Sequence, residues 1–316
     1  MMNIAVSACL LGENVRYDGG HKHDRFVTDE LGRYASFVPF CPEAIAFGTP
    51  RPSVKLVSRD ENILVVSNKD GTDLTKKLLD KSYEEVHRIA DEKLGGIIFK
   101  SRSPSCGLGS TVAYLDNGFA GSKTDGVFAS VCREKFPFLP MEEEGRLQDA
   151  WLRENFIMQL FAYDSIEKLK ESKPSMKAVV DFHTRNKFLL QAKDEKLYRV
   201  LGNIVGNHEN LPFEELFESY EHNFKVAIAQ KSSIKRNRNV LEHMSGFFKN
   251  ELSVLEKESL HEQIDDYAKK IVPIIVPLST IKLYAKKYKT SYLLGQTFLE
   301  PYPKELALRS SLLSSK

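Results

Sequence analysis

The chain opens on Ile4-Ala5-Val6-Ser7-Ala8-Cys9, a short apolar and β-rich run that ends in a cysteine. Similar short runs recur through the first half of the chain, with polar stretches of helical character between them. This alternation is typical of parallel strands that are joined by crossover helices. The first half is therefore predicted to be an α/β domain with a parallel, Rossmann-like sheet in an α/β/α arrangement.

The elements of this domain can be placed approximately from the same pattern. We expect strands at 3–8, 37–40, 96–100 and 137–140, and helices at 28–34, 74–94 and 126–134. Two further runs, 54–57 and 63–66, flank a polar turn and predict a hairpin lid. The segment 118–126 is expected to be a glycine-containing loop beside a site.

The second half has a different pattern, which begins after the acidic run at 142–145. Apolar residues now recur with helical periodicity, and we expect helices at 182–204, 213–230, 240–252, 257–271 and 278–287. A chain of 316 residues also exceeds the size at which one hydrophobic core usually keeps growing. We therefore expect two domains, an α/β domain at 1–165 and an all-α domain at 166–316.

Composition restricts the class of protein. An apolar fraction of 42% with 28% charged residues is ordinary for a globular protein. The longest apolar runs are under half of the roughly 20 residues that a bilayer requires, and no signal peptide is recognisable, so we expect a cytoplasmic protein without a membrane partner. Four cysteines without paired short spacing do not resemble a secreted disulfide framework. The thiols are therefore expected to be free to bind metal.

Three of the cysteines follow predicted strands. Cys9, Cys41 and Cys106 each lie just beyond the carboxyl end of one, which is the edge where open α/β sheets bind ligands. Three thiolates suit a soft centre, either a 4Fe–4S cluster or zinc. Cysteine is also a common buried packing residue, but the polar turns around Cys41 and Cys106 favour a site. Cys132 falls on the apolar face of a predicted helix and is expected to be a packing residue.

The sequence resembles a known family at these residues. The resemblance covers about the first 160 residues and rests on five blocks in order, Val6-Ser7-Ala8-Cys9-Leu10-Leu11-Gly12, Arg16-Tyr17-Asp18-Gly19, Cys41-Pro42-Glu43, Thr49-Pro50-Arg51-Pro52 and Lys100-Ser101-Arg102-Ser103-Pro104-Ser105-Cys106-Gly107. These blocks are similar to those of the thiouracil desulfurase (TudS) family. The second half resembles a YbgA-like helical domain, through 182–187 and 292–296, and that resemblance implies no activity.

The first resemblance implies a 4Fe–4S cluster that is held by three cysteines and keeps one iron open. It also implies hydrolytic removal of sulfur from 2-thiouracil, without net redox change, in which a glutamate and a serine handle protons. A soft thiocarbonyl sulfur would bind an open iron while water attacks the adjacent carbon. Glu43, two residues after Cys41, and Ser103 are the expected catalytic pair, although Ser101 and Ser105 remain open as the hydroxyl. Glu43 also suits a helix N-terminus, and the serines also suit a turn.

Two more residues are candidates for binding the substrate. Arg51, between two prolines, offers a rigid hydrogen-bonding fork to a pyrimidine carbonyl. Asp18 is the second candidate, although Asp18-Gly19-Gly20 is equally a turn sequence. His21 and His23 form a rival metal site with Cys9, although such histidines are more often solvated loop residues.

Two other functions stay open at this stage. The first half could be a zinc-binding or substrate-binding module without turnover, in which the cysteines are structural. The second half could instead be an adaptor that brings thiolated RNA to the first domain. Four basic residues carry that alternative, Lys231, Lys235, Arg236 and Arg238. The small excess of basic residues in the second half is too weak to establish a nucleic-acid partner.

Overall fold

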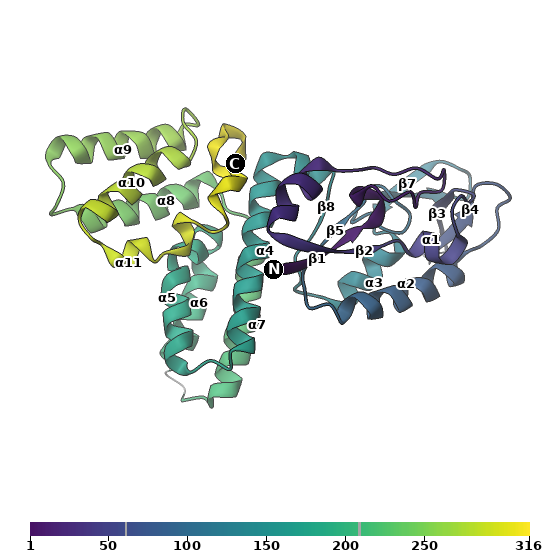
Figure 1. Cartoon of the computed structure of the whole chain (residues 1–316), viewed down its shortest axis with the longest axis horizontal. Helices are drawn as coiled ribbons and strands as arrows, with labels where there is room; N and C mark the ends of the chain where they lie inside the picture. Colours follow the sequence, from purple (N-terminus) through teal and green to yellow (C-terminus); the bar gives the residue numbers. More distant parts are fainter. Residues whose placement is uncertain (61, 208–209) are drawn as a thin grey trace. The chain divides into compact units, whose positions relative to one another are not determined.

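The computed structural model describes residues 1–60, 62–207 and 210–316. It divides into two compact units, Met1–Gln148 and Asp149–Lys316 (Figure 1). The division falls earlier than the expected boundary at residue 165. The reason is α4 (Ala150–Glu171), whose N-terminus is capped by the Asp149 side chain and whose buried residues pack inside the second unit.

A parallel four-stranded sheet forms the centre of the first unit. Its strands are β1 (Met2–Ser7), β2 (Ala35–Phe40), β5 (Leu94–Phe99) and β8 (Met141–Glu143), in the order β2-β1-β5-β8. Every pair is parallel. The connecting helices are α1 (Pro42–Phe47), α2 (Thr75–Ala90) and α3 (Val127–Lys135). Phe128 of α3 packs against Phe40 and Phe99 of the sheet, so the predicted α/β class is confirmed.

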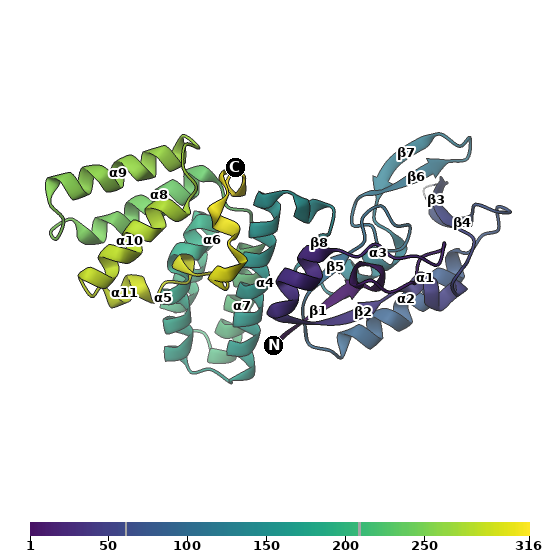
Figure 2. The ribbon, with the colours of Figure 1, turned by 45° about the horizontal axis from the view of Figure 1, so that its top comes forward.

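A second sheet extends from the first unit. It contains β3 (Val54–Arg59), β4 (Asn62–Ser67), β6 (Thr111–Leu115) and β7 (Ala120–Thr124), in the order β4-β3-β6-β7 (Figure 2). The predicted hairpin is present as β3 and β4, although Glu61 in its turn lies outside the described residues. The hairpin of β6 and β7 was not predicted. Segment 118–126, expected to be only a loop, contains β7, whose largely exposed face gives no apolar alternation.

Two other expectations for the first unit were wrong in detail. The fourth strand is 141–143 instead of 137–140, because the acidic residues Glu142 and Glu143 are buried in it. The Glu143 carboxylate accepts hydrogen bonds from the Leu108 backbone and the Ser110 hydroxyl, which makes its burial possible. The predicted helix at 28–34 is a π-turn at Phe26–Glu30 followed by a 3₁₀ turn at Leu31–Arg33.

The second unit is helical, as predicted. After α4 come α5 (Met176–Lys193), α6 (Glu195–Gly206), α7 (Phe213–Ala229), α8 (Ile234–Ser245), α9 (Val254–Ala268), α10 (Ile275–Lys287) and α11 (Ser291–Leu294). The single helix expected at 182–204 is two helices. Asp194 separates them, because its backbone is extended and its carboxylate caps α6 through the amides of Lys196 and Leu197.

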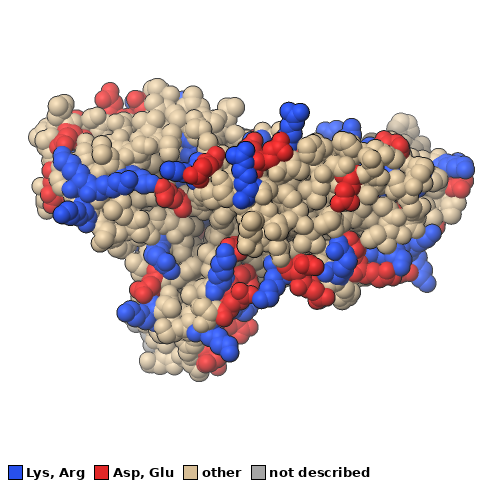
Figure 3. All heavy atoms as spheres, viewed as in Figure 1, with Lys and Arg blue, Asp and Glu red and all other residues tan. Residues whose placement is uncertain are grey.

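Charges of both signs share the face of the molecule shown in Figure 3, where Lys and Arg side chains are interspersed with Asp and Glu side chains. Within the basic cluster at 231–238, Arg238 pairs with Glu242 and Asp265, and Arg236 donates to backbone carbonyls. The second unit therefore uses much of this cluster within its own structure. None of the helices in the described parts of the chain is both long and apolar enough to cross a membrane.

Candidate functional site

The first unit brings three cysteines to one cavity at the carboxyl edge of its parallel sheet. Cys9 lies in the 3₁₀ turn Ala8–Leu11 that follows β1, Cys41 is the N-cap of α1 after β2, and Cys106 lies in the loop after β5. All three line a cavity of about 180 Å³. Cys132 is buried in α3 and is not among the residues that line this cavity, as expected for a packing residue.

The turn that carries Cys106 is held from two sides. Gly126 fits against it because a Cβ atom at that position would lie 2.5 Å from the Ser105 backbone. The first amides of α3 donate to this turn, Val127 to the Pro104 carbonyl and Phe128 to the Ser105 carbonyl. Gly126 also donates to the Gly107 carbonyl at 2.7 Å. The glycine-containing segment expected beside a site therefore does adjoin one.

The three thiols influence one another electrostatically. Burial raises the pKa of Cys9 to about 12, with the Cys41 charge adding to the effect and the nearby Lys100 and Arg16 opposing it. Burial likewise raises the pKa of Cys106 and Cys41, and the Cys41 charge contributes to the shift at Cys106. Three thiolates in this cavity would therefore require a positively charged centre between them.

The donor set fits an iron–sulfur cluster in kind. Three cysteines from three separate segments converge on one partly enclosed cavity, and soft thiolate ligands are those that such clusters use. The three cysteines share this cavity without being arranged as a metal-binding group, since no set of three or more His, Cys, Asp or Glu side chains among the described residues is placed so that it could hold a metal ion.

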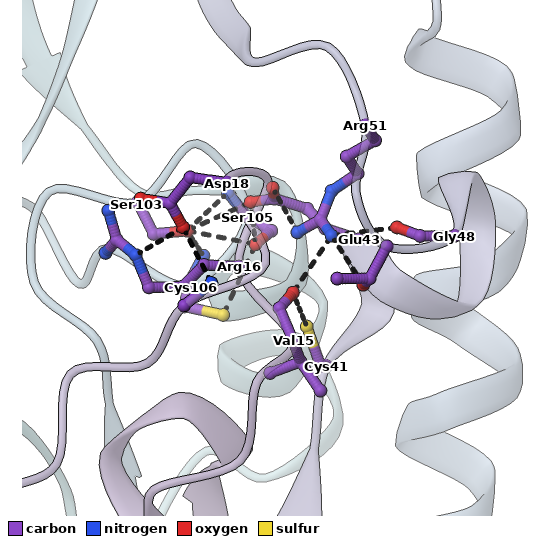
Figure 4. Close-up of polar contacts among 12 residues, drawn as sticks. Val15, Arg16, Asp18, Cys41, Glu43, Gly48, Arg51, Ser103, Ser105 and Cys106 are labelled. Carbon is purple, nitrogen blue, oxygen red and sulfur yellow. Dashed lines mark hydrogen bonds and ion pairs between the residues drawn. The ribbon is translucent and has the colours of Figure 1, made fainter.

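Glu43 is the centre of the polar network in this cavity. It lies in the first turn of α1, and its Oε1 accepts hydrogen bonds from Ser105 Oγ at 2.7 Å and from Ser103 Oγ at 3.1 Å (Figure 4). Ser105 Oγ also lies 3.3 Å from Cys106 Sγ, and Ser103 Oγ accepts from the Cys106 amide at 3.2 Å. The carboxylate and both hydroxyls therefore lie beside the third cysteine.

The other Glu43 oxygen is bound to Arg51. Arg51 Nη2 donates to Glu43 Oε2 at 3.0 Å, and Arg51 Nη1 donates to the carbonyls of Val15 and Gly48, each at 2.9 Å (Figure 4). The Val15 carbonyl also accepts a long hydrogen bond from the Cys41 thiol at 3.8 Å. Arg51 thus connects α1 to the loop that precedes Arg16.

Several sequence-based candidates lie away from this network. Asp18 pairs with Arg16 and is not among the residues lining the cavity; the Gly20 amide and Arg16 lower the pKa of its carboxyl. His21 and His23 are exposed and also do not line it, and His23 bonds to Thr28. The Ser101 hydroxyl donates to Glu144 instead of Glu43. The structure therefore groups Ser103 and Ser105, but not Ser101, with Glu43.

Residues that the sequence did not single out also line the cavity, among them Ser7, Arg16 and Lys100. Lys100 follows β5 and forms an ion pair with Glu144, and its amide donates to Ser7 Oγ at 2.9 Å. Both Arg16 and Lys100 stand inside the blocks that carry the family resemblance, which was the signal available for them.

A larger cleft of about 1120 Å³ adjoins the cysteine cavity. The two share Lys100, Ser101, Arg102 and Pro104. The cleft runs along the second sheet, and five cations line it, Lys55, Lys100, Arg102, Lys123 and Arg146. Glu143 is the acidic residue in the same lining. Two of these cations are paired, Lys100 with Glu144 and Arg146 with Glu142, so the cysteine cavity adjoins a surface of modest positive charge.

Family models match both parts of the chain. Residues 4–144 match the 2-thiouracil desulfurase family, and residues 187–303 match DUF1722, a family of proteins of unknown function. These ranges correspond to the α/β unit and to most of the helical unit.

Individual relatives each match only part of the chain. The uncharacterized protein YbgA of Escherichia coli (strain K12) is 29% identical over 156 residues, which cover 49% of this chain and 92% of YbgA. The uncharacterized protein YbbK of Bacillus subtilis (strain 168) is 31% identical over 130 residues, 39% of this chain and 83% of YbbK. A solved structure described as the [4Fe-4S]-dependent thiouracil desulfidase TudS is 28% identical, with a TM-score of 0.37. The match covers 47% of this chain and 94% of the TudS chain.

Proposed function

The chain belongs to the 2-thiouracil desulfurase family, and from this premise we propose that its first unit removes sulfur from a thiolated pyrimidine by hydrolysis, using a 4Fe–4S cluster. Cys9, Cys41 and Cys106 would hold the cluster. The observation that carries the proposal is that these cysteines share one cavity with a carboxylate that is hydrogen-bonded to two serines.

The reaction joins a water oxygen to the thiocarbonyl carbon and breaks the carbon–sulfur bond, so that 2-thiouracil and water give uracil and hydrogen sulfide. A cluster with three cysteine ligands would supply an open iron that binds the soft sulfur and accepts the departing sulfide. Glu43 Oε1 would take the proton from the attacking water. Ser103 or Ser105, both bonded to this oxygen, would pass the proton to the leaving sulfur or to the ring.

The basic cleft supports a substrate that extends beyond the pyrimidine ring. Of the five cations in the cleft contiguous with the cysteine cavity, Lys100 and Arg146 are paired with glutamates. The other three have no ion pair among the described residues and would favour an anionic group, Lys55, Arg102 and Lys123. We therefore propose that the substrate carries phosphate. A nucleotide or an RNA would contact these cations, whereas a free base such as 2-thiouracil, which carries no phosphate, would be the poorer substrate.

The proposal places the reaction in the cytoplasm. All four cysteines are free thiols in the structure, and a reducing compartment would keep them available as ligands. The second unit is assigned no activity, and RNA contact through it stays a prediction.

Anaerobic reconstitution followed by sulfide-release assays tests the function. The substrate panel contains 2-thiouracil, 2-thiouridine, 2-thiouridine 5′-phosphate and thiolated tRNA. We expect a brown protein that contains iron and releases sulfide, fastest from a phosphorylated substrate. A colourless protein that takes up one equivalent of zinc and releases no sulfide would instead support a structural role for the cysteines.

A further inference from the structure

Resting on the proposed function, we infer that the two arginines at the cysteine cavity have different roles: Arg51 is a positioning residue that holds Glu43, and Arg16 is the cation that contacts the substrate. This reverses the expectation that Arg51 binds the pyrimidine. Both arginines line the cavity, so proximity alone does not separate them. The two roles are distinguished by the hydrogen-bond partners of the two guanidinium groups.

The Arg51 guanidinium is occupied by the protein. Its side chain is only 4% exposed, and its two terminal nitrogens bond to Glu43, the carbonyls of Val15 and Gly48, and the Thr49 hydroxyl. The Arg51 amide also donates to the Tyr17 carbonyl at 3.0 Å. The remaining donor, Nε, is buried without a partner among the described residues, where a substrate could not reach it without movement.

These contacts determine where Glu43 points. Arg51 binds Oε2, and the two serines bind Oε1, so the carboxylate is held between them (Figure 4). Without Arg51 the carboxylate would lose its charged partner and could rotate away from the serines. A displacement of the proton acceptor lowers turnover more than it lowers substrate binding.

Arg16 has the opposite character. Its side chain is 22% exposed, and only its Nε is paired, at 3.4 Å from Asp18 Oδ1. Its guanidinium lies over the Tyr17 ring at 5.5 Å, and its terminal nitrogens have no hydrogen-bond partner among the described residues. It therefore presents four N–H donors beside the cavity, which suits a pyrimidine carbonyl or a phosphate.

The loop that carries Arg16 is anchored by Arg51. Val15 and Tyr17, on either side of Arg16, both accept hydrogen bonds from Arg51 through their carbonyls. Arg51 therefore fixes the backbone from which Arg16 extends, while the two side chains have separate partners. Replacement of each arginine should have a different kinetic signature.

The test measures steady-state sulfide release by the reconstituted full chain, with 2-thiouracil and 2-thiouridine 5′-phosphate as substrates. Arg51→Met should lower kcat at least about tenfold with KM within about threefold, whereas Arg16→Met should raise KM at least about tenfold with kcat within about threefold. Arg51→Lys should partly restore kcat. Arg33→Met, at an exposed arginine, serves as the control for loss of charge.

A double variant separates positioning from a general loss of structure. In the Glu43→Gln background, Arg51→Met should lower kcat less than about threefold further, because its effect passes through Glu43. Arg16→Met should raise KM by the same factor in both backgrounds. Iron per chain is measured for each variant.

Three results would overturn the inference. They are a rise in KM at unchanged kcat for Arg51→Met, full additivity of Arg51→Met with Glu43→Gln, and a KM for Arg16→Met within threefold of that of the unaltered protein. Loss of iron in both Arg51→Met and Arg51→Lys would also overturn it, since Arg51 would then act on Cys41. If the unaltered protein releases no sulfide, the proposed function fails instead, and the variants are compared only after wild-type turnover is established.

Discussion

The two units both bury charged and polar side chains, but they use them differently. In the second unit, buried Glu154 accepts hydrogen bonds from Arg309 and Tyr302, which are also buried and lie far from Glu154 in the sequence. In the first unit, Glu43 bonds to Arg51 and two serines around a cavity that three cysteines line. A similar ion pair thus joins distant chain segments in the second unit and lines a cavity in the first.

The comparison shows that a buried ion pair alone does not identify a functional site. The Glu154–Arg309 pair satisfies its own members and links α4 to the C-terminal segment. The Glu43–Arg51 pair leaves one carboxylate oxygen directed at hydroxyls that adjoin a thiol. What distinguishes the candidate site is the adjacent cavity, which three cysteines line as free thiols. The following experiments test this distinction, from the largest expected effect to the smallest.

Removal of a cluster ligand should have the largest effect. We expect Cys9→Ser, Cys41→Ser and Cys106→Ser each to lose the cluster and all sulfide release, because three ligands converge on one cavity. Iron per chain is the measurement. Cys132→Ala is the matched control, since that buried cysteine lies on α3 outside the cavity. Full iron in one of the first three variants would remove that cysteine from the ligand set.

Glu43→Gln should have the next largest effect. A general base contributes roughly 10²–10⁴-fold to a rate, so single-turnover sulfide release should fall at least about 100-fold. Glutamine keeps the shape of the side chain but cannot accept the proton, and iron content should not change. Glu84→Gln, at an exposed glutamate paired with Lys81, is the control. A fall of less than about tenfold would place the proton acceptor elsewhere.

In the second unit, buried Lys193 should affect stability instead of turnover. The side chain is fully enclosed and donates to Asn155, and burial lowers its pKa from 10.5 to about 7. Between these two values the unfolded chain binds the extra proton, so stability should rise with pH, by at most about 1.4 kcal/mol per pH unit. Lys193→Met should remove this dependence.

Urea unfolding measures this effect, and the single tryptophan, Trp151 in α4, makes the fluorescence specific for the second unit. Lys196→Met, at an exposed lysine, is the control. The stability of Lys193→Met relative to the unaltered protein should decrease from pH 7 to pH 9. A constant difference would show that Lys193 keeps its proton throughout this range.

The smallest effect is expected from separating the units. The fragment Met1–Gln148 contains both sheets and every residue that lines the cysteine cavity. It should fold anaerobically and bind as much iron per chain as the full protein prepared in parallel. An insoluble or iron-free fragment would mean that the first unit requires the second.

Much of the fold could be predicted from the sequence because its signals are local. The apolar runs at β1 and β5 are almost entirely buried, and that at β2 is partly buried, so these strands are visible without any tertiary information. The short strand β8 was misplaced because its buried Glu143 is satisfied by partners more than 30 residues away. Likewise, the end of α5 depends on one side chain, Asp194, in an otherwise continuous helical pattern.

The sequence by itself determined the chemistry available at the site: three strand-end cysteines, a glutamate two residues after one of them and serines before another. Only the tertiary structure decided which groups meet. It placed the Ser103 and Ser105 hydroxyls against Glu43 and the Ser101 hydroxyl against Glu144. It also enclosed Arg51, while the terminal nitrogens of Arg16 have no hydrogen-bond partner in the described part of the chain. The physical reason is that differences of a few tenths of an ångström decide whether a hydrogen bond forms, here between segments about 60 residues apart in the sequence. Residue type and spacing along the chain carry no such information.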